Sequence, residues 1–239
     1  WQDGKQLELK DRTLIMGILN GTPDSFSDGG RYNTSDTAVA HAKLMIEQGA
    51  DILDVGVEST RPGHTQISVA EELERMKEVL LPVLECSTVP VSVDTYRAET
   101  ADFALSQGAH ILNDIWGLKY DKDMAAVAAK YDVPVIIMHN QNSTDYDDII
   151  DDMKAFFFSS VDLALKEGVK PQNIWLDPGI GFGKDYAQNV EVIQRLGEIT
   201  VYEYPVLLAP SRKRFIGTIL NDIPVDQRDE GTVATCITG

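Results

Sequence analysis

The sequence lacks several features that define common protein classes. Its 239 residues include only two cysteines, Cys86 and Cys236, which lie far apart and form no metal-binding motif. No apolar run approaches the length of a membrane-spanning helix, and no signal peptide opens the chain. We therefore expect a cytoplasmic protein with reduced cysteines and no membrane partner. The chain begins at Trp1 rather than at a methionine, so we expect its N-terminus to have been trimmed.

Basic residues are also scarce. Lys and Arg number 21 against 38 Asp and Glu, which gives a formal net charge of −17. A nucleic-acid binder needs a basic face, so we expect no nucleic-acid partner. An anionic small substrate remains compatible if the few cations gather at one site, as Arg61 and the run Arg212, Lys213 and Arg214 indicate.

What the chain does have is a regular alternation of short apolar runs and helical patterns. Its hydrophobic content of 43% is enough for a large core. After a polar ribbon at residues 1–12, strands are expected at 14–19, 52–56, 89–93, 111–112, 133–138, 174–177 and 206–208. Helices are expected at about 34–48, after Ser68, and at about 98–106, 124–131, 148–166 and 188–196.

Unbroken strand–helix alternation with no linker predicts an α/β fold with a parallel sheet. The seven units could form an open, doubly wound sheet, but their spacing fits a (β/α)8 TIM barrel better, with the eighth strand–helix unit absent from the sequence. We expect one domain over residues 1–239. A closed barrel needs one more unit, so we expect the natural chain to extend roughly 25–35 residues past Gly239.

The segment at residues 174–184 is the most informative stretch. A short apolar run ends at Asp177, and Pro178 cannot donate to a sheet ladder, so the strand stops there. Three alternate glycines then allow the backbone to approach a flat or anionic ligand, although their spacing is not the dinucleotide-binding one. Asp177 could serve either as the first residue of a turn or as a ligand-binding carboxylate.

The second interpretation gains weight because polar residues recur at the ends of the other expected strands. These residues are Asn20, Asp54, Asp94, Asn113, His139, Asp177 and Lys213. We expect Asp54 to be structural. Asp94, Asn113 and Asp177 would be costly to bury in one barrel mouth unless a ligand satisfied them. A flat heterocycle with a guanidine-like edge would do so.

Seven motifs in order carry a resemblance to a known family. They are residues 20–29 (NGTPDSFSDG), 59–63 (STRPG), 93–95 (VDT), 111–114 (ILND), 138–139 (MH), 177–182 (DPGIGF) and 211–213 (SRK). Together they resemble the dihydropteroate synthases, transferases of folate biosynthesis that have a TIM-barrel fold and are sulfonamide targets. The resemblance implies condensation of 6-hydroxymethyl-7,8-dihydropterin diphosphate with p-aminobenzoate, by an SN1-like path, to give 7,8-dihydropteroate and pyrophosphate.

The resemblance also assigns roles to residues. It places the pterin deep in the barrel, on Asp94, Asn113 and Asp177. Lys213 would contact the pterin ring, and the surrounding residues would be Ile115, Met138, Gly181 and Phe182. The p-aminobenzoate would lie among Phe26, Thr60, Arg61, Pro62 and Arg214. Catalytic roles would fall to Lys213, Asp94, Asp28 and Arg61.

The resemblance implies one cofactor, a Mg²⁺ ion that holds the diphosphate and is ligated by Asn20. It implies a homodimer as the assembly. It also implies that the missing eighth strand would present an Arg and a His beside the diphosphate.

Three positions depart from the family pattern. Gly21 stands where Val is usual, Val57 where Gly is usual, and Pro210 where Thr is usual. All three are expected at the barrel mouth, where Val57 would add bulk and resist a positive φ angle. These departures leave two alternatives open: a catalytically weak paralogue that binds pterin, and a pterin-dependent methyltransferase. The loops at 20–29 and 59–63 argue against the methyltransferase.

Overall fold

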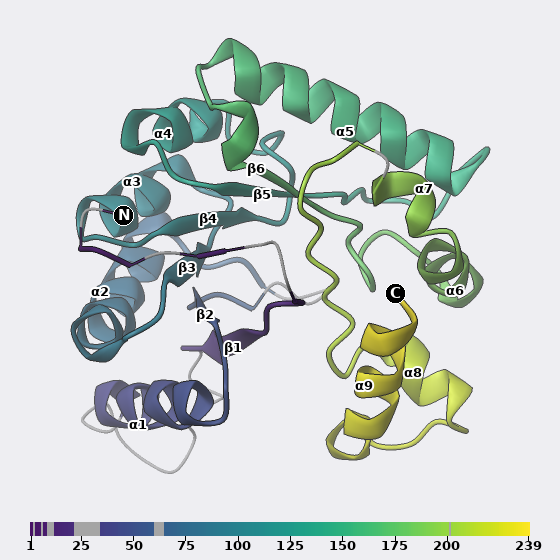
Figure 1. The fold of residues 1–239 in the computed structure, drawn as a ribbon, viewed down its shortest axis with the longest axis horizontal. Helices are drawn as coiled ribbons and strands as arrows, with labels where there is room; N and C mark the ends of the chain where they lie inside the picture. The colour runs from purple at the N-terminus through teal and green to yellow at the C-terminus, as the bar shows by residue number, and fades with distance from the viewer. Residues whose placement is uncertain (2, 6, 9–11, 22–33, 60–64, 201) are drawn as a thin grey trace.

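Six parallel strands run side by side in chain order, from β1 to β6. The structure is a computed structural model that describes residues 1, 3–5, 7–8, 12–21, 34–59, 65–200 and 202–239. The strands are β1 (Met16–Asn20), β2 (Ile52–Gly56), β3 (Val91–Asp94), β4 (Ile111–Asp114), β5 (Val135–Met138) and β6 (Ile174–Asp177). They form a curved sheet with α1 to α5 along its outer side (Figure 1).

The helices alternate with these strands. They are α1 (Thr34–Glu47), α2 (Val69–Cys86), α3 (Ala98–Ser106), α4 (Met124–Tyr131), α5 (Ile149–Lys166), α6 (Tyr186–Gln194), α7 (Gly197–Thr200), α8 (Arg214–Ile219) and α9 (Asp229–Thr238). Short 3-10 turns lie at Pro171–Asn173 and Val225–Gln227. No helix within the described ranges is long and apolar enough to cross a membrane.

Side-chain caps explain where several helices begin. The Ser68 side chain accepts a hydrogen bond from the Glu71 amide at the start of α2, and the Asp148 side chain accepts from two amides at the start of α5. Asp185 and Gln188 form a reciprocal capping box, which starts α6 two residues earlier than the apolar pattern indicates. The predicted bounds of β2, α3 and α4 are confirmed.

The prediction of a seventh strand at 206–208 is wrong. Val206 makes only an isolated parallel bridge to Leu176, through hydrogen bonds of 2.9 and 2.8 Å on either side of it. Pro205 just before it and Pro210 after it lack amide hydrogens, so little of this segment can join a ladder. In the described residues the sheet is therefore open between the Val206 bridge and β1.

Side chains alternate between the two faces of the sheet, as parallel strands under helices require. The outward side chains, such as Leu53, Val93 and Leu176, join the large core beneath the helices. The inward ones at the amino ends of the strands form a second apolar cluster, made of Ile52, Ile111, Ile136 and Trp175.

The ribbon at residues 1–12 is not simply a polar surface segment, because two of its side chains extend this second cluster. Trp1 and Leu7 are half-buried and pack against it. The Trp1 indole donates to the His110 carbonyl at 2.9 Å, and His110 Nε2 bonds Asp3 at 2.8 Å. Trp1 and Leu7 therefore cover the amino end of the sheet interior.

Candidate active site

Polar side chains collect at the opposite, carboxyl ends of the strands. Asp94 ends β3 and pairs in register with Gly56 on one side and Asn113 on the other. Asp177 ends β6 and pairs with Met138 of β5. An added Cβ at Gly56 would lie only 3.3 Å from an Asp94 carboxylate oxygen, so glycine makes room for this carboxyl group.

Asp94 Oδ1 and Asn113 Oδ1 are buried without a hydrogen-bond partner among the described residues. The Asn113 amide nitrogen donates to Asp54 Oδ2 at 3.1 Å, so the side-chain oxygen of Asn113 points away from Asp54. Buried acceptors of this kind are rare in native proteins and favour a ligand that donates N–H groups.

Burial also changes the protonation of these acids. Burial raises the pKa of Asp177 to about 6, while the Gly179 amide and the Lys213 ammonium oppose the rise. Burial raises the pKa of Asp94 well above its ordinary value, and the neighbouring carboxylates of Asp54 and Asp114 add to the effect. Groups with such shifts in one cluster are typical of functional sites.

Lys213 supplies the positive charge beside these acids. It lies just before α8, and its ammonium lies 4.1 Å from the centre of the Phe182 ring. The Lys213 chain passes over Gly181, where an added Cβ would come within 2.9 Å of Cδ. Gly181 also has a φ of +83°, so both backbone geometry and close approach call for glycine here.

An apolar wall completes the cluster. Tyr96, Ile115 and Met138 are buried together, and Trp116 and Phe182 pack against them. Ile115, Met138 and Phe182 are thus brought together as the sequence indicates, and aromatic and aliphatic faces suit a flat ring.

The other predicted site residues are less enclosed. Asn20 is exposed at the end of β1, in register with Gly56, and Arg214 is exposed at the start of α8. Predicted residues Phe26, Asp28, Thr60, Arg61 and Pro62 lie outside the described residues. In the described part of the chain, no group of three or more His, Cys, Asp or Glu side chains could hold a metal ion.

Two of the departures from the family pattern prove to be partners. Val57 is fully buried in the core under the helices, and it does not have a positive φ. An added Cβ at Gly21 would meet Val57 at 3.1 Å and Val79 of α2 at 2.8 Å. The expectation that Val57 adds bulk at the mouth is therefore wrong, because its side chain fills the space that the glycine at 21 leaves.

Pro210, the third departure, is buried, and its carbonyl accepts from the Lys213 amide at 3.0 Å. It opens the turn that presents Lys213. The turn includes Arg212 at a φ of +52°, held by an ion pair to Asp229.

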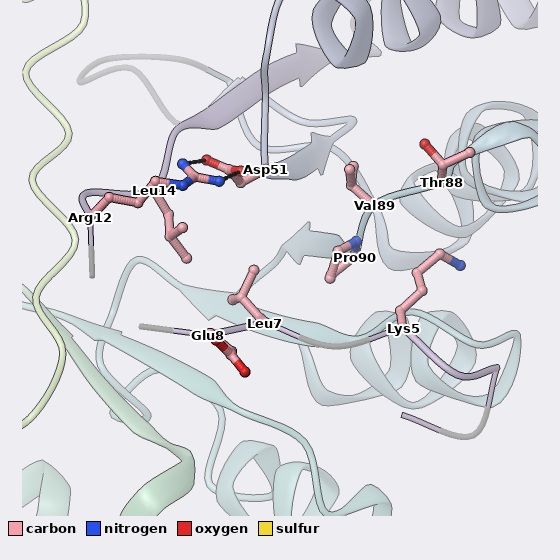
Figure 2. A pocket seen from close by; sticks show the side chains of 9 residues that line it. All are labelled: Lys5, Leu7, Glu8, Arg12, Leu14, Asp51, Thr88, Val89 and Pro90. Carbon is pink, nitrogen blue, oxygen red and sulfur yellow. Dashed lines mark hydrogen bonds and ion pairs between the residues drawn. The ribbon is translucent and has the colours of Figure 1, made fainter. Parts of the chain in front are cut away.

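A separate cavity lies at the amino ends of the strands, away from this site. It has a volume of about 440 Å³ and lies between the N-terminal ribbon and the loops before β1, β2 and β3 (Figure 2). Its lining residues are Lys5, Leu7, Glu8, Arg12, Leu14, Asp51, Thr88, Val89 and Pro90. Arg12 pairs with Asp51 at one edge of it (Figure 2). Its charged residues are of both signs, and Arg12 and Asp51 pair with each other, so we interpret this cavity as structural.

Two further residues contact the cluster. Asp54 accepts a hydrogen bond from the Asn113 amide, a contact compatible with the structural role expected for it. Lys184 is 9% exposed, and its ammonium bonds His139 just beneath the cluster. The signal for Asp54 was its inward position on β2, two residues after Ile52. The signal for Lys184 was its place at the end of the glycine run.

Comparison with known families defines the class of protein. The chain matches the family described as "Pterin binding enzyme" over residues 16–239. A pterin is a flat heterocycle of the kind that the cluster of Asp94, Asn113 and Asp177 favours, so fold, site and family agree on a pterin-binding barrel.

Individual relatives narrow the class further. The chain is 52% identical over 235 residues to the dihydropteroate synthase of Clostridium beijerinckii, covering 98% of this chain and 87% of the relative. It is 51% identical over 233 residues to that of Bacillus subtilis, covering 98% and 81%. The chain therefore belongs to the dihydropteroate synthase family.

Solved structures agree with this assignment. The crystal structure of dihydropteroate synthase from Clostridium difficile, in the presence of pteroic acid, has a TM-score of 0.95 at 51% identity and covers 98% of this chain and 89% of that one. The Xanthomonas albilineans enzyme in complex with 7,8-dihydropteroate has a TM-score of 0.90 at 36% identity, covering 99% and 86%. The predicted TIM-barrel fold is confirmed, although the sheet is open over the described residues.

Proposed function

We propose that this chain condenses 6-hydroxymethyl-7,8-dihydropterin diphosphate with p-aminobenzoate, giving 7,8-dihydropteroate and pyrophosphate. It would thus be a transferase of folate biosynthesis. The observation that carries the proposal is the buried group Asp94, Asn113 and Asp177 near Lys213, in which Asp94 Oδ1 and Asn113 Oδ1 have no hydrogen-bond partner among the described residues. The relatives named dihydropteroate synthase support it.

The pterin would bind in this cluster with its amino-substituted edge toward the acids. Ionised Asp177 would accept from the 2-amino group and the N3 edge, in the two-point geometry that a carboxylate offers to a guanidine-like group. Asp94 and Asn113 would bond the rest of the ring, and Lys213 would contact the ring beside Phe182. Ile115, Met138 and Phe182 would enclose its faces, next to Gly181.

The p-aminobenzoate would bind nearer the mouth. We assign it to Phe26, Thr60, Arg61, Pro62 and Arg214 on the basis of the resemblance, with Asp28 and Arg61 in catalytic roles. Arg214 follows Lys213 directly and is exposed, which suits contact with a carboxylate that stays partly in solvent.

The reaction would proceed through a cation on the pterin methylene carbon. The bond from that carbon to the diphosphate oxygen breaks, and its electron pair leaves with pyrophosphate. The arylamine nitrogen then forms the new bond and loses a proton to solvent or to the departing pyrophosphate. Carboxylates fixed beside the ring stabilise the positive charge as it develops.

A Mg²⁺ ion fits this scheme through Asn20. Its side chain offers a hard oxygen at the exposed end of β1, and Mg²⁺ is usually held by few protein ligands together with substrate phosphates. When bound, the ion would neutralise charge on the leaving diphosphate. The role of Asn20 is to fix where that charge lies relative to the pterin.

The metal role leads to a direct test. Asn20→Ala should reduce pyrophosphate release at least about tenfold at low Mg²⁺, the effect of losing about 1.4 kcal/mol of transition-state stabilisation. Affinity for 6-hydroxymethylpterin, which has no phosphate, should stay unchanged. Full activity of the unaltered chain in excess chelator would remove the metal from the mechanism.

The paralogue alternative loses most of its basis, because Gly21 and Val57 compensate each other in the core. The decisive experiment is conversion of labelled p-aminobenzoate to dihydropteroate, with and without the pterin diphosphate. Product formation only with both substrates supports the synthase. Pterin binding without product would support the paralogue instead.

The assembly and location follow the resemblance. We propose a homodimer acting in the cytoplasm as one domain over residues 1–239. Cys86 and Cys236 form no disulfide, which suits a reducing compartment. Light scattering of the purified chain would measure its mass directly.

A further inference from the structure

Lys184 is a buried cation that the proposed reaction does not use. Its residue is 9% exposed, and its ammonium lies 2.9 Å from His139 Nδ1, 3.0 Å from the Gly179 carbonyl and 3.0 Å from the Phe182 carbonyl. An ammonium group has three N–H donors and no acceptor, so these three acceptors use it completely. A neutral amine would have one donor too few.

The contact with His139 fixes the state of that ring. Because the ammonium can only donate, His139 Nδ1 must accept, which puts the ring proton on Nε2 of a neutral imidazole. Burial, together with the positive charges of Lys184 and Lys119, lowers the pKa of His139 to about 2, which agrees with a neutral ring. His139 therefore serves as a fixed acceptor rather than as a second cation.

The two carbonyls belong to the glycine loop at 179–183. Gly179, Gly181 and Gly183 have φ angles of +67°, +83° and +54°. The Gly179 amide donates to Asp177 Oδ1 at 2.7 Å, and the Phe182 amide donates to the Gly179 carbonyl at 3.0 Å. Lys184 thus bonds the same peptide segment that orients the Asp177 carboxylate.

The loop also shapes the position of Lys213. The Lys213 chain passes over Gly181, and its ammonium lies over the Phe182 ring at 4.1 Å. The hydrogen bond from Lys184 to the Phe182 carbonyl therefore fixes the residue that carries this ring. One buried ammonium is therefore connected, through one short loop, to both charged groups proposed to hold the pterin.

Lys184 and Asp177 also affect each other's pKa. Burial lowers the pKa of Lys184 to about 7, and the Asp177 carboxylate opposes this shift. In return, Lys184 helps lower the pKa of Asp177, after the Gly179 amide and Lys213. Losing the charge would leave a buried carboxylate with less compensation.

We propose that Lys184 is a positioning residue of the pterin site, whose ammonium, anchored on His139, holds the 179–183 loop so that Asp177 and Lys213 face the ring. This inference rests on the proposed function, since it assigns the residue to the same site. It adds a residue that would touch neither substrate.

The test removes the donor and the acceptor separately. Lys184→Met keeps the length of the chain and loses the charge. His139→Leu removes the acceptor, whereas His139→Asn keeps an acceptor oxygen near the Nδ1 position. Lys166→Met, on the exposed end of α5, is the matched control, because its side chain is 69% exposed.

Affinity for 6-hydroxymethylpterin is measured by calorimetry, and both KM values by steady-state kinetics. We expect Lys184→Met and His139→Leu to weaken pterin binding at least about tenfold, as loss of a charged hydrogen bond would. The KM for the pterin diphosphate should rise, and that for p-aminobenzoate, at saturating pterin diphosphate, should not. His139→Asn should stay within about threefold of the unaltered chain, and Lys166→Met should match it.

Each other result has a defined meaning. A folded Lys184→Met protein with unchanged pterin affinity overturns the inference. If that variant does not fold, equal affinities of the two His139 variants overturn it. If the unaltered chain binds no pterin, the proposed function fails, and hydrogen exchange of the 179–183 amides then decides alone whether Lys184 fixes the loop. Exchange that is no faster in His139→Leu than in His139→Asn would overturn that role.

Discussion

At the scale of single residues, Asp177 combines a structural cost with a proposed binding role. Its folded pKa of about 6 lies above the ordinary value of 3.8 because of burial. Between about pH 4 and 6 the folded chain therefore keeps a proton that the unfolded chain has released. The stability that Asp177 contributes is present below this window and declines as the pH rises through it.

This linkage gives a prediction for Asp177→Asn, which cannot titrate. The free energy of unfolding of the unaltered chain, measured relative to that of the variant, should fall by about 3 kcal/mol between pH 4 and pH 7, since two pKa units correspond to about 2.7 kcal/mol. Urea denaturation at several pH values measures it. Pterin affinity of the unaltered chain should rise over the same window, because ionised Asp177 is the acceptor in the proposed function. A difference that does not change with pH would contradict the prediction.

Gly21 and Val57 show how two unusual residues can explain each other. Gly21→Val would place its side chain against Val57 and Val79, so we expect a loss of about 1–3 kcal/mol from overpacking. Val57→Gly should leave a cavity and also destabilise. The double variant should lose clearly less stability than the sum of the two, because the new valine occupies the vacated space.

A double-mutant cycle in urea measures this coupling. Additive losses would mean that the two positions are independent, and that their joint departure from the family pattern has another cause.

At the scale of elements, a buried ion network joins β2, α2 and α3. Arg97, just before α3, pairs with Glu58 after β2 at 2.5 Å and with Glu72 of α2 at 2.6 Å. Glu58 also accepts from the Ile67 amide, and Arg97 donates to the Ile67 carbonyl at 2.9 Å. The network therefore fixes both ends of the segment that contains 59–63, one of the family's motifs.

Arg97→Met should destabilise the protein by about 3–5 kcal/mol, because it leaves two buried carboxylates without their cation. Lys77→Met is the matched control. Its pair with Glu74 is exposed, so it should cost less than about 1 kcal/mol. Thermal and urea unfolding of both variants would measure the contrast. Equal losses would mean that the network contributes no more than a surface pair.

The elements also indicate what the sequence could predict. Apolar patterns located β2, α3 and α4, because these signals are local. The strand at 206–208 failed because ladder pairing depends on a neighbour, and Pro205 and Pro210 limit it. That Asp94, Asn113 and Asp177 lie at the same edge of the sheet was predictable from strand ends. The contacts of Asp54 and Lys184 were not, since they depend on which side chain lies opposite, and that is set by register and loop geometry.

At the scale of the whole molecule, the two ends of the sheet interior differ in chemistry. The amino end is apolar, with Ile52, Ile111, Ile136 and Trp175 covered by Trp1 and Leu7. The carboxyl end holds the acids and Lys213. The net charge of −17 would repel anionic substrates at a distance, so the cations Lys213 and Arg214 matter most where they are placed, at the mouth.

The apolar layer at the amino end has a kinetic consequence. It closes the amino end of the sheet interior, so we expect two substrates that bind at different depths to enter from the carboxyl end. The molecule proposed to bind deeper, the pterin diphosphate, then has to arrive first, and p-aminobenzoate follows it. A pterin analogue should be competitive against the pterin diphosphate and noncompetitive against p-aminobenzoate, while a p-aminobenzoate analogue should be uncompetitive against the pterin diphosphate. Initial-rate inhibition patterns measure this. Noncompetitive inhibition by each analogue against the other substrate would mean that binding is not ordered.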